Sequence, residues 1–378
     1  MKLGDVISVA NTEKCGNRTF PVLSMTMHDG LILQTDRFKK TIASKDLSNY
    51  KVVRRNQLVV SFPIDEGVLY IQDVTNAGIV SPAYAVWDVD TKIVRPRFLG
   101  MFLRCPMCIQ HYKAKLRGST ARRRTIPRED FLAMKIPTFT ITEQDRICLV
   151  LEKIESVIKT SGKQMQLLQH LVKSRFVEMF GDGKRFPSVM VGEVFTVKGP
   201  KRIHKEEWTS EGVPFYRVSN LSDLLEGRET TSDSFISRSR FEELKADGQV
   251  PAVGDVLVTA RGTLGRCYVV KPHDEFYFQD GMITWLTDRS ERIALPYFLQ
   301  VVQSQTFKRQ YKGKSSGTTV AYMTIGQLAK YRLPFPPLPL QREFAAFVTK
   351  VDKLAFAARK RRDAAKQLYR AKIQEFFG

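Results

Sequence analysis

Residues 331–378 of this chain read YRLPFPPLPLQREFAAFVTKVDKLAFAARKRRDAAKQLYRAKIQEFFG. Residues 134–181, MKIPTFTITEQDRICLVLEKIESVIKTSGKQMQLLQHLVKSRFVEMFG, can be laid over them without a gap, at a constant offset of 197 positions. The apolar positions keep the same register throughout. The identical pairs include Pro137 with Pro334, Gln144 with Gln341, Lys153 with Lys350, Glu178 with Glu375, Phe180 with Phe377 and Gly181 with Gly378. A match of this kind indicates two copies of one supersecondary unit.

The sequence before each copy is also repeated, although the spacing drifts by several residues. The matching pairs, in chain order, are Gly4 to Val9 with Gly192 to Val197, Asn56 to Ser61 with Gly254 to Thr259, Trp87 with Trp285, Tyr112-Lys113 with Tyr311-Lys312, and Thr125-Ile126 with Thr324-Ile325. Because the order is kept, we predict the succession globule, helix, globule, helix.

The repeated segments carry a heptad pattern. The first copy places Ile147, Leu151, Ile154, Ile158, Ser161, Met165, Leu168 and Val172 at steps of four and three. The second places Phe344, Val348, Val351, Ala355, Ala358, Arg362, Ala365 and Tyr369 there, a narrower seam. This spacing predicts two long helices of roughly 55 Å. Proline-bearing segments, 135–137 and 332–339, precede them, and because they cannot be helical they predict where each helix begins.

A heptad seam is often explained by an intermolecular coiled coil, but two matching helices in one chain can pair with each other. We therefore predict an α+β fold with two similar globular domains separated by two long helices packed as an intramolecular antiparallel coiled coil. The predicted boundaries are 1–136 for the first globular domain, 137–182 for the first helix region, 183–333 for the second globular domain and 334–378 for the second helix region.

The charge of the chain points to a polyanionic partner. Its 378 residues carry a formal net charge of +21, so nucleic acid is the first candidate and a membrane surface the second. No apolar run approaches 18 residues and the N-terminus is too short and polar for a signal peptide, so we expect a cytoplasmic protein. The five cysteines are irregularly spaced, which is typical of reduced thiols.

Each globular half shows the pattern of a small sheet with a flanking helix. Strands are predicted at 57–62, 84–89, 255–259 and 282–286, and helix-like stretches at 97–115 and 296–312.

Four features are candidates for contact with nucleic acid. They are the glycine-rich loop 260–266, the paired basic segments 113–124 and 312–319, the loop 198–204 and the strand end 215–220. Basic residues beside small hydroxyls suit phosphate, and Arg and Asn pair with base edges. For the two last features a solvated loop is an equally good explanation, and a bare hairpin turn is the alternative for the first. The candidate residues are Lys113, Lys115, Arg117, Ser119, Arg122, Arg123, Lys198, Lys201, Arg202, Arg217, Asn220, Arg261, Thr263, Arg266, Lys312, Lys314, Ser315 and Thr318.

Catalytic motifs are missing from the sequence. It has no phosphate loop, no dinucleotide fingerprint and no nucleophile elbow. Cys105 and Cys108 with His111 suggest zinc, but the second copy lacks matching residues and no fourth ligand is evident, so no metal site is predicted.

The duplicated layout and three segments resemble the specificity subunits of type I restriction-modification enzymes. The segments are 333–343, a proline-rich start of the second spacer helix, with Gly254 to Leu257 and Arg261 to Thr263. The first copy departs from this pattern, because residues 138–143 replace the proline-rich run.

The resemblance implies a non-catalytic subunit with two target recognition domains, each recognising half of a bipartite asymmetric DNA target. It also implies two modification (methylase) subunits that use S-adenosylmethionine, and restriction subunits that use ATP and Mg, with no cofactor in this chain. A recognition module of a related stand-alone modification or defence system remains the alternative. A scaffold that binds acidic proteins and a nuclease acting alone are hypotheses from other classes.

Overall fold

The structure is a computed structural model that describes residues 1–27, 29–37, 46–116, 125–311 and 322–378. The chain divides into two compact units. Unit 1 comprises Met1–Lys163 with Ala358–Gly378, and unit 2 comprises Gln164–Ala357. Among the described helices, none is both long and apolar enough to cross a lipid bilayer.

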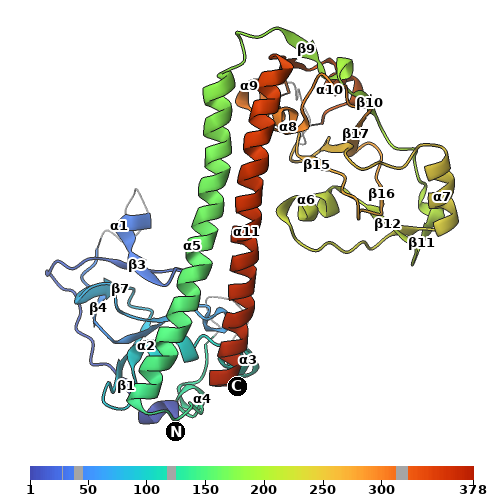
Figure 1. Cartoon of the computed structure of the whole chain (residues 1–378). Helices are drawn as coiled ribbons and strands as arrows, with labels where there is room; N and C mark the ends of the chain where they lie inside the picture. Colours follow the sequence, from blue (N-terminus) through green and yellow to red (C-terminus); the bar gives the residue numbers. More distant parts are fainter. Residues whose placement is uncertain (28, 38–45, 117–124, 312–321) are drawn as a thin grey trace. The chain divides into compact units, whose positions relative to one another are not determined.

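Two helices of equal length, α5 (Ile141–Phe180) and α11 (Leu338–Phe377), are the longest elements. Each has 40 residues, and both bounds of α11 lie 197 positions after those of α5, which is the offset of the sequence repeat. Figure 1 shows α5 in green and α11 in red. One detail of the prediction is wrong, because Leu338 and Pro339 belong to the helix. Proline is tolerated in the first turn, where no N–H is needed.

The two helices pack against each other in both units. In unit 1, Leu151 of α5 and Ile373 of α11 lie in one buried core, and the Tyr369 hydroxyl donates to Glu155 Oε1 at 2.8 Å. In unit 2, the Phe344 ring of α11 lies 5.6 Å from the ring of Phe180 of α5. Early α5 therefore meets late α11, and late α5 meets early α11. The predicted intramolecular antiparallel pairing is confirmed.

Each unit contains the same four-stranded antiparallel sheet, which we call the frame sheet. Its strand order is β1-β8-β5-β6 in unit 1 and β10-β17-β14-β15 in unit 2. The bounds in unit 1 are β1 Ile7–Val9, β5 Leu58–Val60, β6 Leu69–Ile71 and β8 Ala85–Val89, and in unit 2 β10 Thr196–Lys198, β14 Val256–Thr259, β15 Cys267–Val269 and β17 Ile283–Thr287. The predicted strands are confirmed, and the duplication extends to the topology.

The strand register corrects one predicted equivalence. Leu58 is paired with Trp87 in unit 1, and its counterpart Val256 is paired with Leu286 in unit 2. Leu286 is thus the counterpart of Trp87, and the predicted match with Trp285 is wrong by one position. Since side chains alternate along a strand, this shift puts Trp285 on the other face of its sheet, in a different core.

A second equivalence is corrected by two short helices. They are α4 (Arg128–Leu132) and α10 (Ile325–Lys330), and they begin 197 positions apart. The repeat therefore keeps its offset back to this point, so that Thr125-Ile126 corresponds to Tyr322-Met323 and not to Thr324-Ile325. The reason is that the segments whose lengths differ between the two copies lie before residues 125 and 322.

Each predicted flanking helix is two helices. In unit 1 these are α2 (Pro96–Phe102) and α3 (Pro106–Lys115), and in unit 2 α8 (Leu295–Gln303) and α9 (Gln305–Lys308). The first break occurs at Cys105, which is extended because it precedes a proline. The second occurs at Ser304, which is also extended and whose hydroxyl accepts from the Phe307 N–H.

Two smaller features recur in both units. The 3-10 turns Leu3–Asp5 and Val191–Glu193 each precede the first strand of a frame sheet, and the pairing of β9 with β18 in unit 2 matches the bridge between Lys2 and Lys135 in unit 1. The other elements differ between the units. Unit 1 adds the pairs β2-β3 and β4-β7, whereas unit 2 adds the mixed sheet β11-β13-β12-β16. The bounds are β2 Leu23–Met25, β3 Leu31–Leu33, α1 Gln34–Arg37, β4 Lys51–Arg54, β7 Ala77–Val80, β9 Ser188–Met190, β11 Trp208–Thr209, β12 Val213–Tyr216, α6 Val218–Glu226, β13 Phe235–Ile236, α7 Arg238–Ala246, β16 Tyr277–Phe278 and β18 Arg332–Pro334, with 3-10 turns at Leu3–Asp5, Ile64–Glu66, Val191–Glu193 and Lys205–Glu207. Apart from the recurring turns and the pairing of β9 with β18, these elements are inserts, and they are the part of the fold that the repeat does not predict.

A buried glutamine anchors the first turn of each long helix. The Gln144 amide accepts from the Arg95 N–H at 2.7 Å and donates to the carbonyls of Ile93 and Phe139. Gln341 makes the equivalent three bonds in unit 2, to the N–H of Ala294 and the carbonyls of Arg292 and Pro336. Both side chains are almost fully buried, at 1% and 0% exposure. The same polar contact therefore joins helix to globular part in both units.

Candidate nucleic-acid interface

The structure places ten of the candidate residues. The other eight lie outside the residues that the structure describes: Arg117, Ser119, Arg122, Arg123, Lys312, Lys314, Ser315 and Thr318. In unit 1, Lys113 and Lys115 are exposed in the last turn of α3, and Lys115 Nζ lies 3.5 Å from Asp130. Cations in the last turn of a helix also interact favourably with the helix dipole, so the position of these two lysines has a structural explanation as well.

In unit 2, Arg202 borders a hollow of about 320 Å³ that we call the polar hollow. Its lining residues are Arg202, Ile203, His204, Lys205, Glu206, Trp208, Phe215, Gln279 and Asp280. The Arg202 guanidinium lies 3.7 Å from the Asp280 carboxylate, and Lys201 Nζ lies 3.8 Å from Asp247. Both cations are exposed, so these ion pairs are weak and leave the charges open to a phosphate.

Arg217 joins this group through Trp208. Its guanidinium lies 5.2 Å from the Trp208 ring centroid and donates to Ser234 Oγ at 3.1 Å. Guanidinium and indole thus present a charged and a flat surface together, the combination that binds phosphates and stacks on bases.

Asn220 and Lys198 have structural roles. The Asn220 carbonyl oxygen accepts from the Arg217 N–H in the capping box of α6, and its amide nitrogen donates to Thr230 Oγ1 and the Thr231 carbonyl. Asn220 is also only 9% exposed, so its side chain has a structural explanation, and contact with a base stays a prediction. Lys198 Nζ sits 3.9 Å from the Trp285 ring centroid and covers that ring.

The loop 260–266 is the hairpin between β14 and β15, as the alternative for this motif predicted. The fully buried Thr259 closes it, because its hydroxyl donates to the Thr263 carbonyl and accepts from the Arg266 N–H. Gly265 has a φ of 76° and faces the Tyr311 hydroxyl, so a side chain there would be strained. Arg261 and Thr263 are exposed at the tip.

The two arginines of this hairpin differ in how far an ion pair already engages them. Arg266 is held 3.4 Å from Glu226 with 30% of its side chain exposed. Arg261 forms no ion pair within the residues that the structure describes. Arg261 is therefore the cation of this loop that is most available to a ligand.

Sequence reasoning missed Trp208 and Gln279. Trp208 follows Lys205, Glu206 and Glu207, and no motif marks it, while Gln279 comes from a segment 71 positions later. The basic cluster around His204 next to a tryptophan is a signal that could have found Trp208. Gln279 required the parallel pairing of β12 with β16, which no local pattern predicts.

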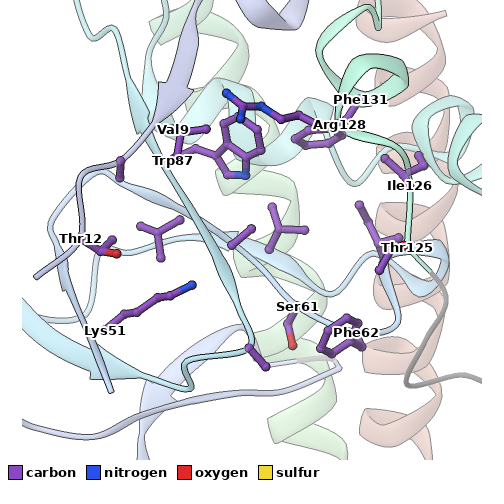
Figure 2. A pocket seen from close by; sticks show the side chains of 16 residues that line it. Val9, Thr12, Lys51, Ser61, Phe62, Trp87, Thr125, Ile126, Arg128 and Phe131 are labelled. Atoms are coloured by element: carbon purple, nitrogen blue, oxygen red, sulfur yellow. The ribbon is translucent and has the colours of Figure 1, made fainter. Parts of the chain in front are cut away.

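Unit 1 has an apolar cavity of about 460 Å³ beside its frame sheet (Figure 2). Figure 2 shows Trp87 and Arg128 at one end, and Lys51, Ser61 and Phe62 at the other. The Arg128 guanidinium lies 5.5 Å from the Trp87 ring centroid, and Lys51 Nζ donates to the Tyr84 carbonyl at 2.7 Å. Both cations at the rim are thus already engaged, so the cavity presents mainly apolar surface.

The cysteine pair lies in the core of unit 1 at the start of α3. The hydrogen bond from the Cys108 thiol lowers the pKa of Cys105 to about 7, against the effect of burial, and nearby backbone N–H groups add to the lowering. The same bond and burial raise the pKa of Cys108. Within the described ranges, no three His, Cys, Asp or Glu side chains group so as to hold a metal ion.

Comparison with known proteins identifies relatives. The family described as the type I restriction modification DNA specificity domain matches residues 184–366. The chain is 22% identical over 365 residues to the type I restriction enzyme MjaVIII specificity subunit of Methanocaldococcus jannaschii, covering 88% of this chain and 81% of that protein. It is 30% identical over 167 residues to the type I restriction enzyme specificity subunit S.HindORF215P of Haemophilus influenzae, covering 44% of this chain and 40% of that protein.

The fold has a solved counterpart. The S subunit of a type I restriction-modification system from M. genitalium superposes with a TM-score of 0.61, covering 100% of this chain and 95% of that one. The sequences are 13% identical, so this likeness concerns the fold.

Proposed function

We propose that this chain, whose residues 184–366 match the type I restriction modification DNA specificity domain, is a specificity subunit that selects the DNA sequence on which such a complex acts. The observation that carries the proposal is the frame sheet, which occurs twice with different inserts. Equal frames imply that the two units do the same kind of task. Different inserts imply that they do it on different sequences, so the target is bipartite and asymmetric.

In this proposal residues 1–136 and 183–333 are target recognition domains, and residues 137–182 and 334–378 are spacer helix regions. The chain carries no catalytic step and no cofactor. Two methylase subunits bring S-adenosylmethionine, and restriction subunits bring ATP and Mg. The complex works in the cytoplasm, where its DNA substrate is.

The proposed DNA contacts follow from exposure and charge. In unit 2 they are Lys201, Arg202 and Arg217 around the polar hollow, with Arg261, Thr263 and Arg266 on the hairpin. Lys113 and Lys115 extend the set to unit 1. The excess of basic residues in the whole chain supports affinity for phosphate, whereas base edges supply the selectivity.

Co-expression with its methylase in a host lacking other modification systems tests this function. We expect sequencing of methylated bases to find one split motif, with two short constant stretches separated by a gap of fixed length and free sequence. The physical reason is that two separate domains each recognise one stretch. An uninterrupted motif, or methylation that does not depend on this chain, contradicts the proposal.

Replacing Arg261 by alanine should weaken binding of the motif-bearing duplex about tenfold, or about 1.4 kcal/mol, because an exposed cation at a hairpin tip is lost. Fluorescence anisotropy at fixed salt measures this, and urea unfolding should be unchanged. Arg266→Ala is the matched control, because Arg266 is already engaged by Glu226, and we expect a smaller loss. An equal loss for both variants would contradict a special role for Arg261.

A further inference from the structure

The second long helix carries a concentration of positive charge that its copy lacks. Six of the twelve residues from Arg359 to Arg370 are Arg or Lys, against two of twelve in the equivalent segment 162–173 of α5. The two helices have equal length and form one antiparallel pair, so neither helix formation nor pairing requires this charge. Like charges four residues apart destabilise a helix, so the charge serves some other purpose.

Three of these cations form a line that we call the basic stripe: Arg359, Lys366 and Arg370. At about 100° per residue they fall within about 40° of one another around the axis, over about 16 Å of helix. All three are exposed, and within the described part of the chain none of them forms an ion pair. Of the six cations in the run, Arg362 is paired, with Asp363.

The stripe faces the same side of α11 as the globular part of unit 1. Phe377 lies eighteen residues after Arg359, which is five full turns and the same direction from the axis. The Phe377 ring packs 5.5 Å from Phe98 and 5.6 Å from Phe102, both in α2. From that contact toward the N-terminus of α11, the stripe therefore continues along the same side of the helix as the domain that would recognise DNA.

We propose that the basic stripe binds the phosphate backbone of duplex DNA beside the bases that unit 1 recognises. This rests on the function proposed above and adds a role for the second spacer helix, which then contributes affinity that is independent of sequence. Cations on a rigid helix suit this task, since phosphates recur regularly along a duplex and need no base-specific geometry. The seam residues Ala358 and Ala365 lie about 80° and 100° around the axis from Lys366, the nearest member of the stripe. All three residues of the stripe are exposed, so pairing with α5 leaves the stripe open.

The double variant Lys366→Gln with Arg370→Gln tests the proposal in the full chain assembled with its methylase. Binding is measured by fluorescence anisotropy from low to high salt, on a duplex with the methylated motif and on one with that motif scrambled. We expect affinity for both duplexes to fall about tenfold and their ratio to stay constant. We expect the slope of log affinity against log salt to become shallower by about 1.8, or about 0.9 per lost phosphate contact.

The matched control is Lys360→Gln with Arg361→Gln, which removes the same charge from the same helix. These residues lie about 100° and 200° around the axis from Arg359, away from the stripe. We expect the control to keep the wild-type slope. An equal change in both variants would show a general charge effect and overturn the stripe as a site.

Two further outcomes are decisive. If the stripe variant keeps the wild-type slope but loses its methylase, as measured by gel filtration, the stripe contacts a protein and the proposal is wrong. If the wild-type complex does not distinguish the two duplexes, the proposed function fails, whereas a shallower slope for the stripe variant alone would still support phosphate binding. Circular dichroism verifies that each variant keeps its helix content.

Discussion

Replacing Phe180 by alanine is expected to cost unit 2 about 4 kcal/mol of unfolding free energy, the range for a buried phenylalanine. Phe180 is 1% exposed and ends α5 among four aromatic rings. Its ring centroid lies 4.8 Å from Tyr297, 5.1 Å from Phe176 and 5.6 Å from Phe344. The alanine leaves a cavity at the point where both long helices meet the globular part, so little can collapse to fill it. Urea unfolding of the full chain measures the loss, and hydrogen exchange locates it in unit 2.

The control for this variant is Phe356→Ala on α11. Phe356 is 69% exposed, so its removal should change the unfolding free energy by less than about 0.5 kcal/mol. A cost for Phe180→Ala as small as that of the control would mean that the aromatic cluster does not hold α5 to unit 2.

The second large effect is expected at the two buried glutamines. Replacing Gln341 by leucine should cost about 3 kcal/mol, because one buried N–H and two carbonyls lose their partners while the volume hardly changes. Gln144→Leu should cost about the same in unit 1, since it makes the same three bonds. Urea unfolding monitored by hydrogen exchange measures each unit separately.

Gln169→Leu is the control for both substitutions, because Gln169 is exposed on α5. We expect it to leave stability within about 0.5 kcal/mol of the wild type. If leucine at Gln144 and Gln341 were tolerated as well as at Gln169, these hydrogen bonds would not anchor the helices.

The long helices could be predicted from the sequence because their signals are local and occur twice. Prolines at Pro137 and Pro334, the heptad seam and the gapless offset all agree, and only the first turn at Leu338 was misplaced. Four of the eight frame strands, β5, β8, β14 and β17, were also predicted, since each is a short run rich in β-branched residues. The match of Trp87 with Trp285 failed because the two residues were paired by their identical type and not by the face of the sheet on which each side chain lies. An error of one position in the register puts a side chain on the opposite face of the strand.

The inserts could not be predicted because their pairing is long-range. Strands β11 and β13 have two residues each, and β12 pairs with β16 some sixty positions later. The same limit applies to the candidate interface. The hairpin carrying Arg261 follows a recognisable strand, but the polar hollow needs segments that meet only in the folded unit. The capping role of Asn220 was not foreseen, because an Asn side chain near a strand end can either close a capping box or contact a base.

The repeated frame sheet has an evolutionary consequence. Strands of the same order carry different inserts in the two units, so insert sequence can vary while the frame keeps its hydrogen bonds and its glutamine anchor. Recombination between related genes at the frame strands would then transplant a complete insert onto an unchanged support. A lineage could acquire new sequence preferences by exchanging such cassettes, with no need to re-optimise the remainder of the molecule.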